Sequence, residues 1–173
     1  MKKSIFSTVF LIGALGFGVS TSAQDYVYSK SHVTAVNPYR EKGSKIVDKI
    51  DVNINAVRDF TKNFKNATDV KWVNHENGTS VYFSIDGVKM RSTYNTKGKR
   101  EYSLKYYDES GLPTDVRHLV RSTYYDYGIT IATEVARNER VSYLVKMEND
   151  KEYLTVKVND GELSVFEKTT KAK

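Results

Sequence analysis

The chain of 173 residues contains no cysteine. Disulfide bonds are therefore excluded, and stability must come from a packed core, which a chain of this length is able to supply. The same absence excludes thiol nucleophiles, thiol redox couples and thiolate metal sites. Tyrosine, by contrast, occurs 13 times. Tyrosine suits half-buried sheets, because its ring packs while its hydroxyl reaches water.

Motifs of common enzyme classes are also absent. No HExxH, no GxSxG and no glycine-rich phosphate-binding loop occurs, and the glycines stand where turns are expected. His75 and Glu76 could begin a metal site, but His32 and His118 show no ligand spacing. We therefore interpret His75 as an exposed residue at the rim of a hairpin. The sequence predicts a non-enzymatic protein with no catalytic residue, no cofactor and no metal.

The excess of basic over acidic residues is small. Lys and Arg number 27 against 21 Asp and Glu, a formal net charge of +6 that is spread along the chain. This balance favours solubility over nucleic-acid binding. One predicted hairpin is locally basic and contains Lys89, Arg91, Lys97, Lys99, Arg100 and Lys105. It could bind anions, but lysine on strands also discourages aggregation between sheets, and we favour that explanation.

The N-terminus resembles a secretory signal peptide. Lys2 and Lys3 precede an apolar stretch, Ile5–Val19, and small residues follow up to Ala23. The alternative is a membrane anchor, but the apolar stretch is shorter than the roughly 20 residues that span a bilayer. We expect cleavage between Ala23 and Gln24. The mature protein is expected to be periplasmic or secreted, without stable membrane insertion.

Hydrophobic periodicity predicts one helix and four strands in the first half of the chain. Phe60 and Phe64 lie on one face of a helix, for which Asn53 or Asn55 is available as the N-cap. Apolar and polar residues then alternate in four runs: Val70 and Trp72; Val81, Phe83 and Ile85; Val88, Met90 and Tyr94; and Tyr102, Leu104 and Tyr106. Turns at Asn77-Gly78, Asp86-Gly87 and Lys97-Gly98 separate these runs.

The same order of patterns returns after Gly111. Pro113 suits the first turn of a second helix, and Val116 and Val120 have helical spacing. Four alternating runs follow, at residues 129–135, 141–147, 152–158 and 163–166. The sequence therefore predicts an α+β fold: a tandem duplication of a helix plus a four-stranded antiparallel meander, with the helices packed on one face of the sheet. Because each unit is small, we expect the two to share a core or a continuous sheet.

These patterns divide the chain into four segments. Residues 1–23 are the expected signal peptide, and residues 24–52, which show no sustained pattern, are an N-terminal arm or linker. Residues 53–110 form the first helix-plus-sheet unit and residues 111–173 the second.

Three strings stand out in these patterns: AVRDFTKNFKNATDVKW at residues 56–72, VYFSIDGVKMRSTYNTKG at 81–98 and LPTDVRHLVRSTY at 112–124. Through them the chain resembles the PepSY-like family of exported Bacteroidota proteins. The resemblance spans about residues 53 to 168. It implies a fold similar to the beta-lactamase inhibitor protein and an activity of binding or inhibiting an exported enzyme. It implies no catalytic residue, and the inhibitor's disulfides have no counterpart here.

The face of the sheet directed away from the helices is the candidate binding surface. Alternation assigns Lys71, Val73, Tyr82, Arg91, Lys105 and Tyr107 to this face in the first unit, and Leu144, Tyr153 and Phe166 in the second. Aromatic residues beside arginine are typical of protein-binding surfaces. Tyr82, Arg91, Lys105 and Tyr107 are the predicted contacts with an unknown exported or cell-envelope protein. Three alternatives stay open: contact between the two units, half-exposed tyrosines without a binding role, and small-ligand or metal binding in the groove between the units.

Overall fold

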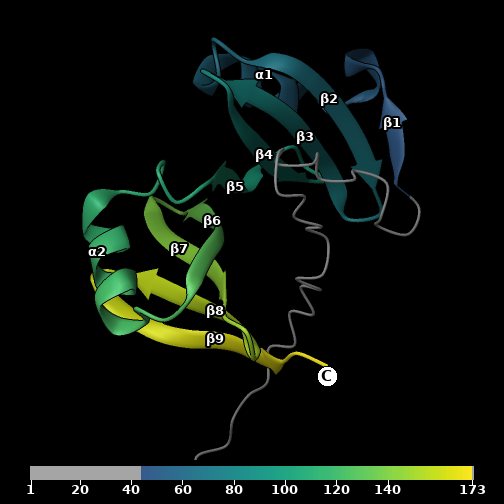
Figure 1. Cartoon of the computed structure of the whole chain (residues 1–173). Coiled ribbons are helices and arrows are strands. Elements are labelled where there is room, and N and C mark those ends of the chain that lie inside the picture. The colour runs from purple at the N-terminus through teal and green to yellow at the C-terminus, as the bar shows by residue number, and fades with distance from the viewer. Residues whose placement is uncertain (1–43, 173) are drawn as a thin grey trace, which may run out of the picture.

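A computed structural model describes residues 44–172 and shows one antiparallel sheet of nine strands with two short α-helices (Figure 1). The strands are β1 (Lys45–Val47), β2 (Thr68–His75), β3 (Gly78–Ile85), β4 (Val88–Asn95), β5 (Arg100–Tyr107), β6 (Gly128–Arg137), β7 (Arg140–Glu148), β8 (Glu152–Asn159) and β9 (Glu162–Thr170). The helices are α1 (Ile54–Asn63) and α2 (Thr114–Thr123), and a 3-10 turn, η1, spans Lys49–Asp51. The strands lie across the sheet in the order in which they occur in the chain.

The expected fold class, a tandem duplication of a helix plus a four-stranded meander, is wrong. The strands within residues 44–172 form one nine-stranded sheet, and each helix contributes only ten residues. β1, from a segment without a sustained pattern, adds a ninth strand and pairs Ile46 with Val73. β5 and β6 pair across the expected boundary between the units. Alternation predicts that a run is a strand, but it does not specify the strand's partner.

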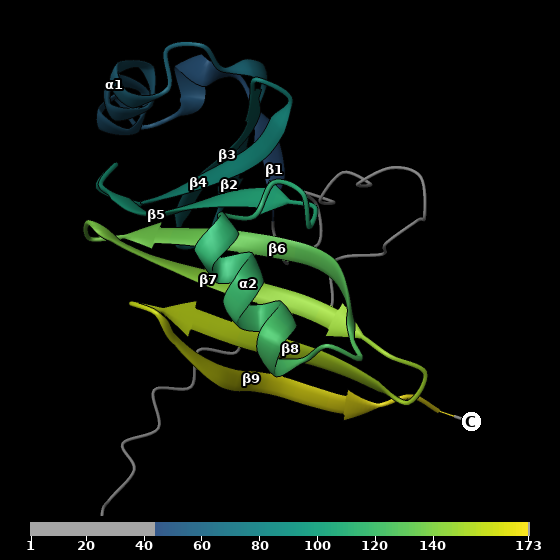
Figure 2. The ribbon, with the colours of Figure 1, turned by 60° about the vertical axis from the view of Figure 1, so that its left-hand side comes forward.

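The pairing of β5 with β6 makes the sheet continuous. Five residue pairs, from Ser103–Ala136 to Tyr107–Ala132, join these strands. α2 lies in the connection between them, so the chain leaves β5, forms the helix and returns to the next position in the sheet. Figure 2 shows α2 lying across β6, β7 and β8.

α1 is capped by Asn53, one of the two residues that the sequence offered as its N-cap. The side-chain oxygen of Asn53 accepts a hydrogen bond from the Asn55 backbone N–H at 2.9 Å, which makes Asn53 the N-cap. The Asn53 side-chain nitrogen donates to the Thr96 carbonyl oxygen at 3.0 Å and attaches the helix to the turn between β4 and β5. In that turn, Gly98 has a φ of +74°, and a side chain there would collide with Asn53 and Asn55.

α1 packs on β2, β3 and β4 through aromatic side chains. The Phe60 ring meets the Trp72 and Phe83 rings edge to face, with centroid separations of 5.2 and 5.0 Å. The first core consists of Val52, Ala56, Phe60, Trp72, Val81, Phe83, Met90 and Tyr94. The fully buried Tyr94 donates from its hydroxyl to Asp59 at 2.9 Å, so its polar end is satisfied.

α2 covers the other half of the sheet. The second core consists of Leu112, Val116, Val120, Tyr127, Ala132, Val145, Met147, Leu154, Val156 and Val158. Arg121 of α2 forms an ion pair with Glu109 in the preceding loop and donates to the Tyr127 carbonyl oxygen at 2.8 Å. These two contacts attach α2 to the loops on both sides of it.

The register of the strands shows that both helices lie on one face of the sheet. Directly opposed residues of an antiparallel pair project to the same side. One row of opposed residues consists of Phe83, Met90, Lys105, Glu134, Tyr143 and Val158. Phe83 and Met90 belong to the first core and Val158 to the second, so this row marks the helix face. The adjacent row, Tyr82, Arg91, Leu104, Val135 and Ser142, projects to the opposite side, the helix-free face.

A β-bulge interrupts the outermost strand. Val156 of β8 pairs with Val165 of β9, whereas Thr155 pairs with Glu167. Phe166 is therefore the extra residue of a bulge, and it is exposed.

Several predictions concern residues outside the described range of 44–172. These are the signal peptide at residues 1–23, the cleavage junction between Ala23 and Gln24, and the first part of the arm, which includes His32. His118, in contrast, lies within the described range, on α2.

Replacing Phe60 with alanine should lower the free energy of unfolding by about 3–5 kcal/mol, because it removes three ring contacts, with Phe64, Trp72 and Phe83, and leaves a cavity in the first core. Urea denaturation followed by the fluorescence of Trp72, the single tryptophan, measures the change. Tyr125→Ala is the control: this side chain is 85% exposed, and its loss should change stability by less than about 0.5 kcal/mol. A Phe60→Ala loss below about 1 kcal/mol would contradict the packing described above.

Candidate functional site

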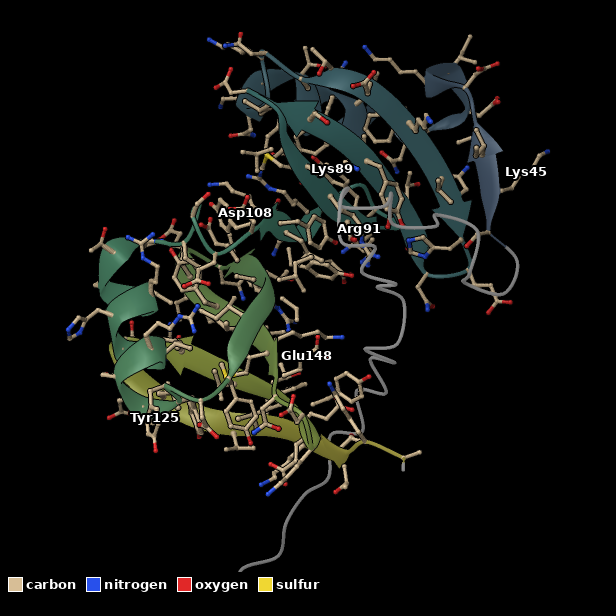
Figure 3. The ribbon with its side chains drawn as sticks, viewed as in Figure 1. Lys45, Lys89, Arg91, Asp108, Tyr125 and Glu148 are labelled. Atoms are coloured by element: carbon tan, nitrogen blue, oxygen red, sulfur yellow. The ribbon has the colours of Figure 1, made fainter. Side chains whose placement is uncertain are left out.

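On the helix-free face, Arg91 of β4 lies between two tyrosines. Figure 3 shows the position of Arg91. Its Nη2 donates to the Tyr102 hydroxyl at 2.7 Å, and its Nη1 donates to the Tyr82 hydroxyl at 3.5 Å. The guanidinium carbon lies 5.8 Å from the Tyr82 ring centroid and 5.7 Å from the Tyr102 centroid, within range for a cation–π contact. Tyr82, Arg91 and Tyr102 are here called the Arg91 cluster.

The environment of Arg91 preserves its charge. Burial by itself would lower the pKa of the guanidinium. The phenol groups of Tyr102, Tyr82 and Tyr106 act in the opposite direction, and the pKa of Arg91 is raised above its ordinary value. Arginine remains protonated in proteins, so the helix-free face carries a permanent positive charge among aromatic rings.

Beside the Arg91 cluster, the helix-free face contains buried residues. Val73, Ser80 and Thr93 are 1, 2 and 4% exposed. The Ser80 and Thr93 hydroxyl oxygens lie 3.1 Å apart and share a hydrogen bond. His75 Nε2 lies 3.3 Å from the Ser80 hydroxyl oxygen. His75 therefore stands at the β2–β3 hairpin with a hydrogen-bonding partner on the neighbouring strand.

Two kinds of site do not occur in the described part of the chain. No group of three His, Asp or Glu side chains between residues 44 and 172 is arranged to hold a metal ion. Across the same residues, neither helix combines the length and the apolar composition that a bilayer-crossing helix needs.

The structure separates the four residues that the sequence proposed as partner-binding positions. Tyr82 and Arg91 are directly opposed on β3 and β4 and lie in contact on the helix-free face. Lys105 and Tyr107 project to the helix face, because Lys105 is opposite Met90 of the first core. The Arg91 cluster and the two β5 residues are therefore on opposite sides of the sheet.

Lys105 and Tyr107 both contact the buried carboxylate of Glu134. Lys105 Nζ lies 3.1 Å from Glu134 Oε1, and the Tyr107 hydroxyl donates to Oε2 at 2.8 Å. The Tyr143 hydroxyl also donates to Oε2, at 3.5 Å. Burial, and then the Glu134 carboxylate, raise the pKa of the Tyr107 phenol. This Glu134 cluster links β5, β6 and β7.

The outward residues that the sequence proposed in the second half do not gather into one site. Leu144 is opposite Thr133, in a row that includes Tyr106 of the helix-free face. Tyr153 is exposed, and Lys171 Nζ lies 4.7 Å from its ring centroid. Phe166 is the bulged residue of β9.

A polar cavity of about 200 Å³ lies at one end of the sheet. Its lining residues are Asn95, Lys99, Arg100, Glu101, Arg137 and Asn138. They come from the ends of β4, β5 and β6 and from the turns that follow β4 and β6, so both halves of the chain contribute. Three cations and one carboxylate surround this cavity. Arg100 is also ion-paired with Asp59, at 3.4 Å, so the excess of positive charge comes from Lys99 and Arg137.

Tyr102 is the functional candidate that the sequence analysis missed. It alternates in phase with Leu104 and Tyr106 and was expected to face the core. In the structure it makes the shorter of the two tyrosine hydrogen bonds to Arg91. The β4–β5 register pairs Thr93 with Tyr102, and Thr93 has the same parity as Arg91. The hairpin register was therefore the signal that could have placed Tyr102 beside Arg91.

No protein-family model matches this sequence, and no curated protein matches it. Solved structures do resemble it. A BLIP-like protein from Bacteroides fragilis aligns with a TM-score of 0.59 and 14% identity, covering 69% of this chain and 86% of its own. A DUF2874 family protein from Bacteroides ovatus aligns with a TM-score of 0.57 and 16% identity, covering 67% of this chain and 85% of its own. A Bacteroides eggerthii protein that is expected to be periplasmic aligns with a TM-score of 0.57 and 12% identity, covering 69% of this chain and 88% of its own.

These similarities concern the fold. Identities of 11–16% are too low to transfer an activity, and the shared property is the arrangement of the chain in space. The chain therefore has a BLIP-like fold.

Replacing Tyr107 with phenylalanine should lower the free energy of unfolding by about 1.5–3 kcal/mol, because it removes a short hydrogen bond to the buried Glu134 carboxylate. Tyr143→Phe is the matched control on the same carboxylate: its hydroxyl is 0.7 Å farther away, and its loss should cost less. Chemical denaturation at pH 7 gives both values. Equal losses, or a larger loss for Tyr143→Phe, would show that Tyr107 is not the principal phenol partner of Glu134.

Proposed function

We propose that this protein is an exported, non-enzymatic binding module that holds another exported or cell-envelope protein against its helix-free face. The observation that carries the proposal is the Arg91 cluster: a permanent cation held between two tyrosine rings on the side of the sheet away from α1 and α2. Arginine and tyrosine are among the residue types that dominate the energetics of protein interfaces.

The Arg91 cluster has the properties of an interface anchor. Its two tyrosines restrict the guanidinium through hydrogen bonds and ring contacts, so little side-chain entropy is lost when a partner binds. Tyrosine presents a large apolar ring with a polar end, which suits a surface that alternates between solvent and a partner. Binding across this face would act by steric occlusion, without any reaction.

The fold similarity supports an inhibitor-like role. One of the similar structures is described as BLIP-like, and the chain shares its arrangement. Occlusion of an exported enzyme, with β-lactamases as the first enzymes to test, follows from that name as a hypothesis. The narrower assignment to the PepSY-like family rests on the short strings described above.

Export is the second part of the proposal. The basic, then apolar, then small-residue order of residues 1–23 is typical of a signal peptide cleaved between Ala23 and Gln24. The Bacteroides eggerthii protein of similar fold is expected to be periplasmic, which agrees with a location outside the cytoplasm.

Substitution of Tyr82 and Arg91 with alanine should abolish partner binding, while Tyr125→Ala should leave it unchanged. The mature protein from Gln24 is used to capture a partner from periplasmic extract, and the dissociation constant is then measured with the purified partner. Truncation of one anchor should weaken binding at least about 30-fold, the equivalent of 2 kcal/mol. Thermal melting verifies that each variant is folded. Wild-type affinity in folded Tyr82→Ala and Arg91→Ala variants would overturn the proposal.

The cavity at the ends of β4, β5 and β6 supports a second candidate function, the binding of a small anionic ligand. Lys99 and Arg137 supply the positive charge, Arg100 shares its charge with Asp59, and Asn95 and Asn138 supply amide groups for orientation. This is the small-ligand alternative for the groove between the two halves, restricted to anions by the residues present.

A polycarboxylate probe such as citrate should raise the melting temperature of the wild-type protein, because a ligand that binds only the folded state stabilises it. Arg137→Ala should reduce this shift by removing a lining cation. Arg140→Ala, close in sequence but not part of the lining, is the matched control and should retain the shift. The ligand hypothesis is rejected if citrate stabilises none of the three proteins beyond the effect of an equal ionic strength of sodium chloride.

A further inference from the structure

The polar cavity at the end of the sheet lies where the pairing of β5 with β6 stops. The last residue pair between these strands is Ser103–Ala136, although β5 begins at Arg100 and β6 continues to Arg137. No residue pair joins residues 100–102 to Arg137. The lining residues are therefore those of strand ends and turns, where side chains are not committed to the packing of either core.

A β-bulge in β5 supplies the one carboxylate of the lining. Thr93 of β4 is opposite Tyr102 of β5. Tyr94, the next residue of β4, is opposite Arg100. Glu101 is therefore the extra residue of a bulge, a feature that changes the direction of a side chain and is frequent next to functional sites. The shift in register thus accompanies the presence of an acid in a lining that otherwise consists of cations and amides.

Three of the four charged side chains in the lining form no ion pair with any residue between 44 and 172. Arg100 is the exception, because it is paired with Asp59 of α1 at 3.4 Å. Lys99, Glu101 and Arg137 take part in none of the ion pairs in this part of the chain. The cavity therefore presents two cations and one carboxylate to a ligand.

The electrostatic complement of this lining is a ligand with two carboxylates and one ammonium group. The carboxylates would face Lys99 and Arg137, and the ammonium group would face Glu101. An acidic amino acid carries these three groups at neutral pH. A ligand with carboxylates alone would place an anion beside Glu101, so this residue discriminates against it. A residue at either end of a peptide has one group fewer: the N-terminal residue lacks the α-carboxylate, and the C-terminal residue lacks the ammonium group.

The volume and the amide groups of the cavity agree with such a ligand. The volume is about 200 Å³. Pockets for drug-sized ligands have roughly 300–1,000 Å³, so this cavity suits a smaller molecule. The side-chain oxygen of Asn95 accepts hydrogen bonds from the backbone N–H groups of Lys97 and Lys99, both at 3.0 Å. Its amide nitrogen is then the group that can donate to a carboxylate, and Asn138 adds a second amide to the lining.

We propose that this cavity binds a free acidic amino acid such as glutamate, with the carboxylates at Lys99 and Arg137 and the ammonium group at Glu101. The proposal rests on the second candidate function above, the binding of a small anionic ligand, and narrows it to one chemical class. It does not depend on protein binding at the helix-free face. Because β4, β5 and β6 all contribute to the lining, the bound ligand connects strand ends that backbone pairing leaves unjoined.

Glutamate and glutarate are a matched pair of ligands, because glutarate is glutamate without its ammonium group. The dissociation constant of each is measured with the mature protein from Gln24 by NMR titration, at pH 7 and equal ionic strength. Glutamate should bind about three to five times more tightly than glutarate, the range expected for one additional exposed ion pair. Attraction by the cations alone would give the opposite order, since glutarate carries the larger negative charge.

Three variants locate the effect. Glu101→Gln should remove the preference, so that glutarate binds at least as tightly as glutamate, and Arg137→Ala should weaken the binding of both ligands. Glu139→Gln is the matched control: it removes a carboxylate from the same turn as Asn138 but outside the lining, and it should retain the preference. Thermal melting verifies that each variant is folded. The proposal is overturned if the wild-type protein does not prefer glutamate, or if folded Glu101→Gln protein keeps the preference.

The outcomes separate this proposal from the functions proposed above. If citrate and glutarate bind and glutamate has no advantage, the cavity is an anion site and only the amino-acid assignment is rejected. If none of the three ligands binds, the assignment and the second candidate function are both rejected. Protein binding at the helix-free face is tested independently, because none of these variants changes the Arg91 cluster.

Discussion

The backbone pairing of β5 with β6 is the interaction on which the rest of the structure depends. Five residue pairs join two stretches that an independent-unit arrangement would leave as sheet edges. Because register is transmitted across every pair, this connection places the first and second cores on the same side of the sheet. It therefore also leaves one face of the whole sheet without either helix. As a result, the polar residues of β5 are divided between the helix face and the helix-free face.

The Glu134 cluster and the Arg91 cluster lie on opposite faces of the sheet and share strand β5. On one side, Lys105 and Tyr107 of β5 and Tyr143 of β7 contact the Glu134 carboxylate of β6, so three strands are linked. On the other side, Arg91 has hydroxyl and ring partners. The first arrangement neutralises a buried charge, whereas the second holds a guanidinium against two tyrosine rings. Charge neutralisation inside the sheet serves stability, whereas arginine beside tyrosine is typical of protein interfaces, so recognition is proposed for the second cluster.

Much of the local structure was predictable from the sequence. The Asn53 cap, the helical spacing of Phe60 and the Asp86-Gly87 turn depend on neighbours within a few residues, and each has the expected place. The turn expected at Asn77-Gly78 lies one residue earlier, at Glu76-Asn77, because Gly78 pairs with His75 and begins β3. The sequence left open whether the two units share a core or a continuous sheet, because strand pairing is a long-range property; β1, only three residues long, carried no pattern that predicted its place. The orientation of β5 was ambiguous as well: Tyr102, Leu104 and Tyr106 alternate with Lys105 and Tyr107, and both sets are amphipathic. Only the β4–β5 register decides between them.

The bulge at Phe166 has a consequence for how the protein behaves at high concentration. An open sheet ends in strands whose outer N–H and C=O groups invite pairing with further chains, and β9 is such a strand with nine residues. The extra residue breaks the regular spacing of β9 and increases its local twist. A strand of a second molecule could form regular hydrogen bonds with β9 on only one side of the bulge at a time. The terminal strand is thereby a poor template for fibre growth, which suits a protein that has no disulfide to restrain its edges.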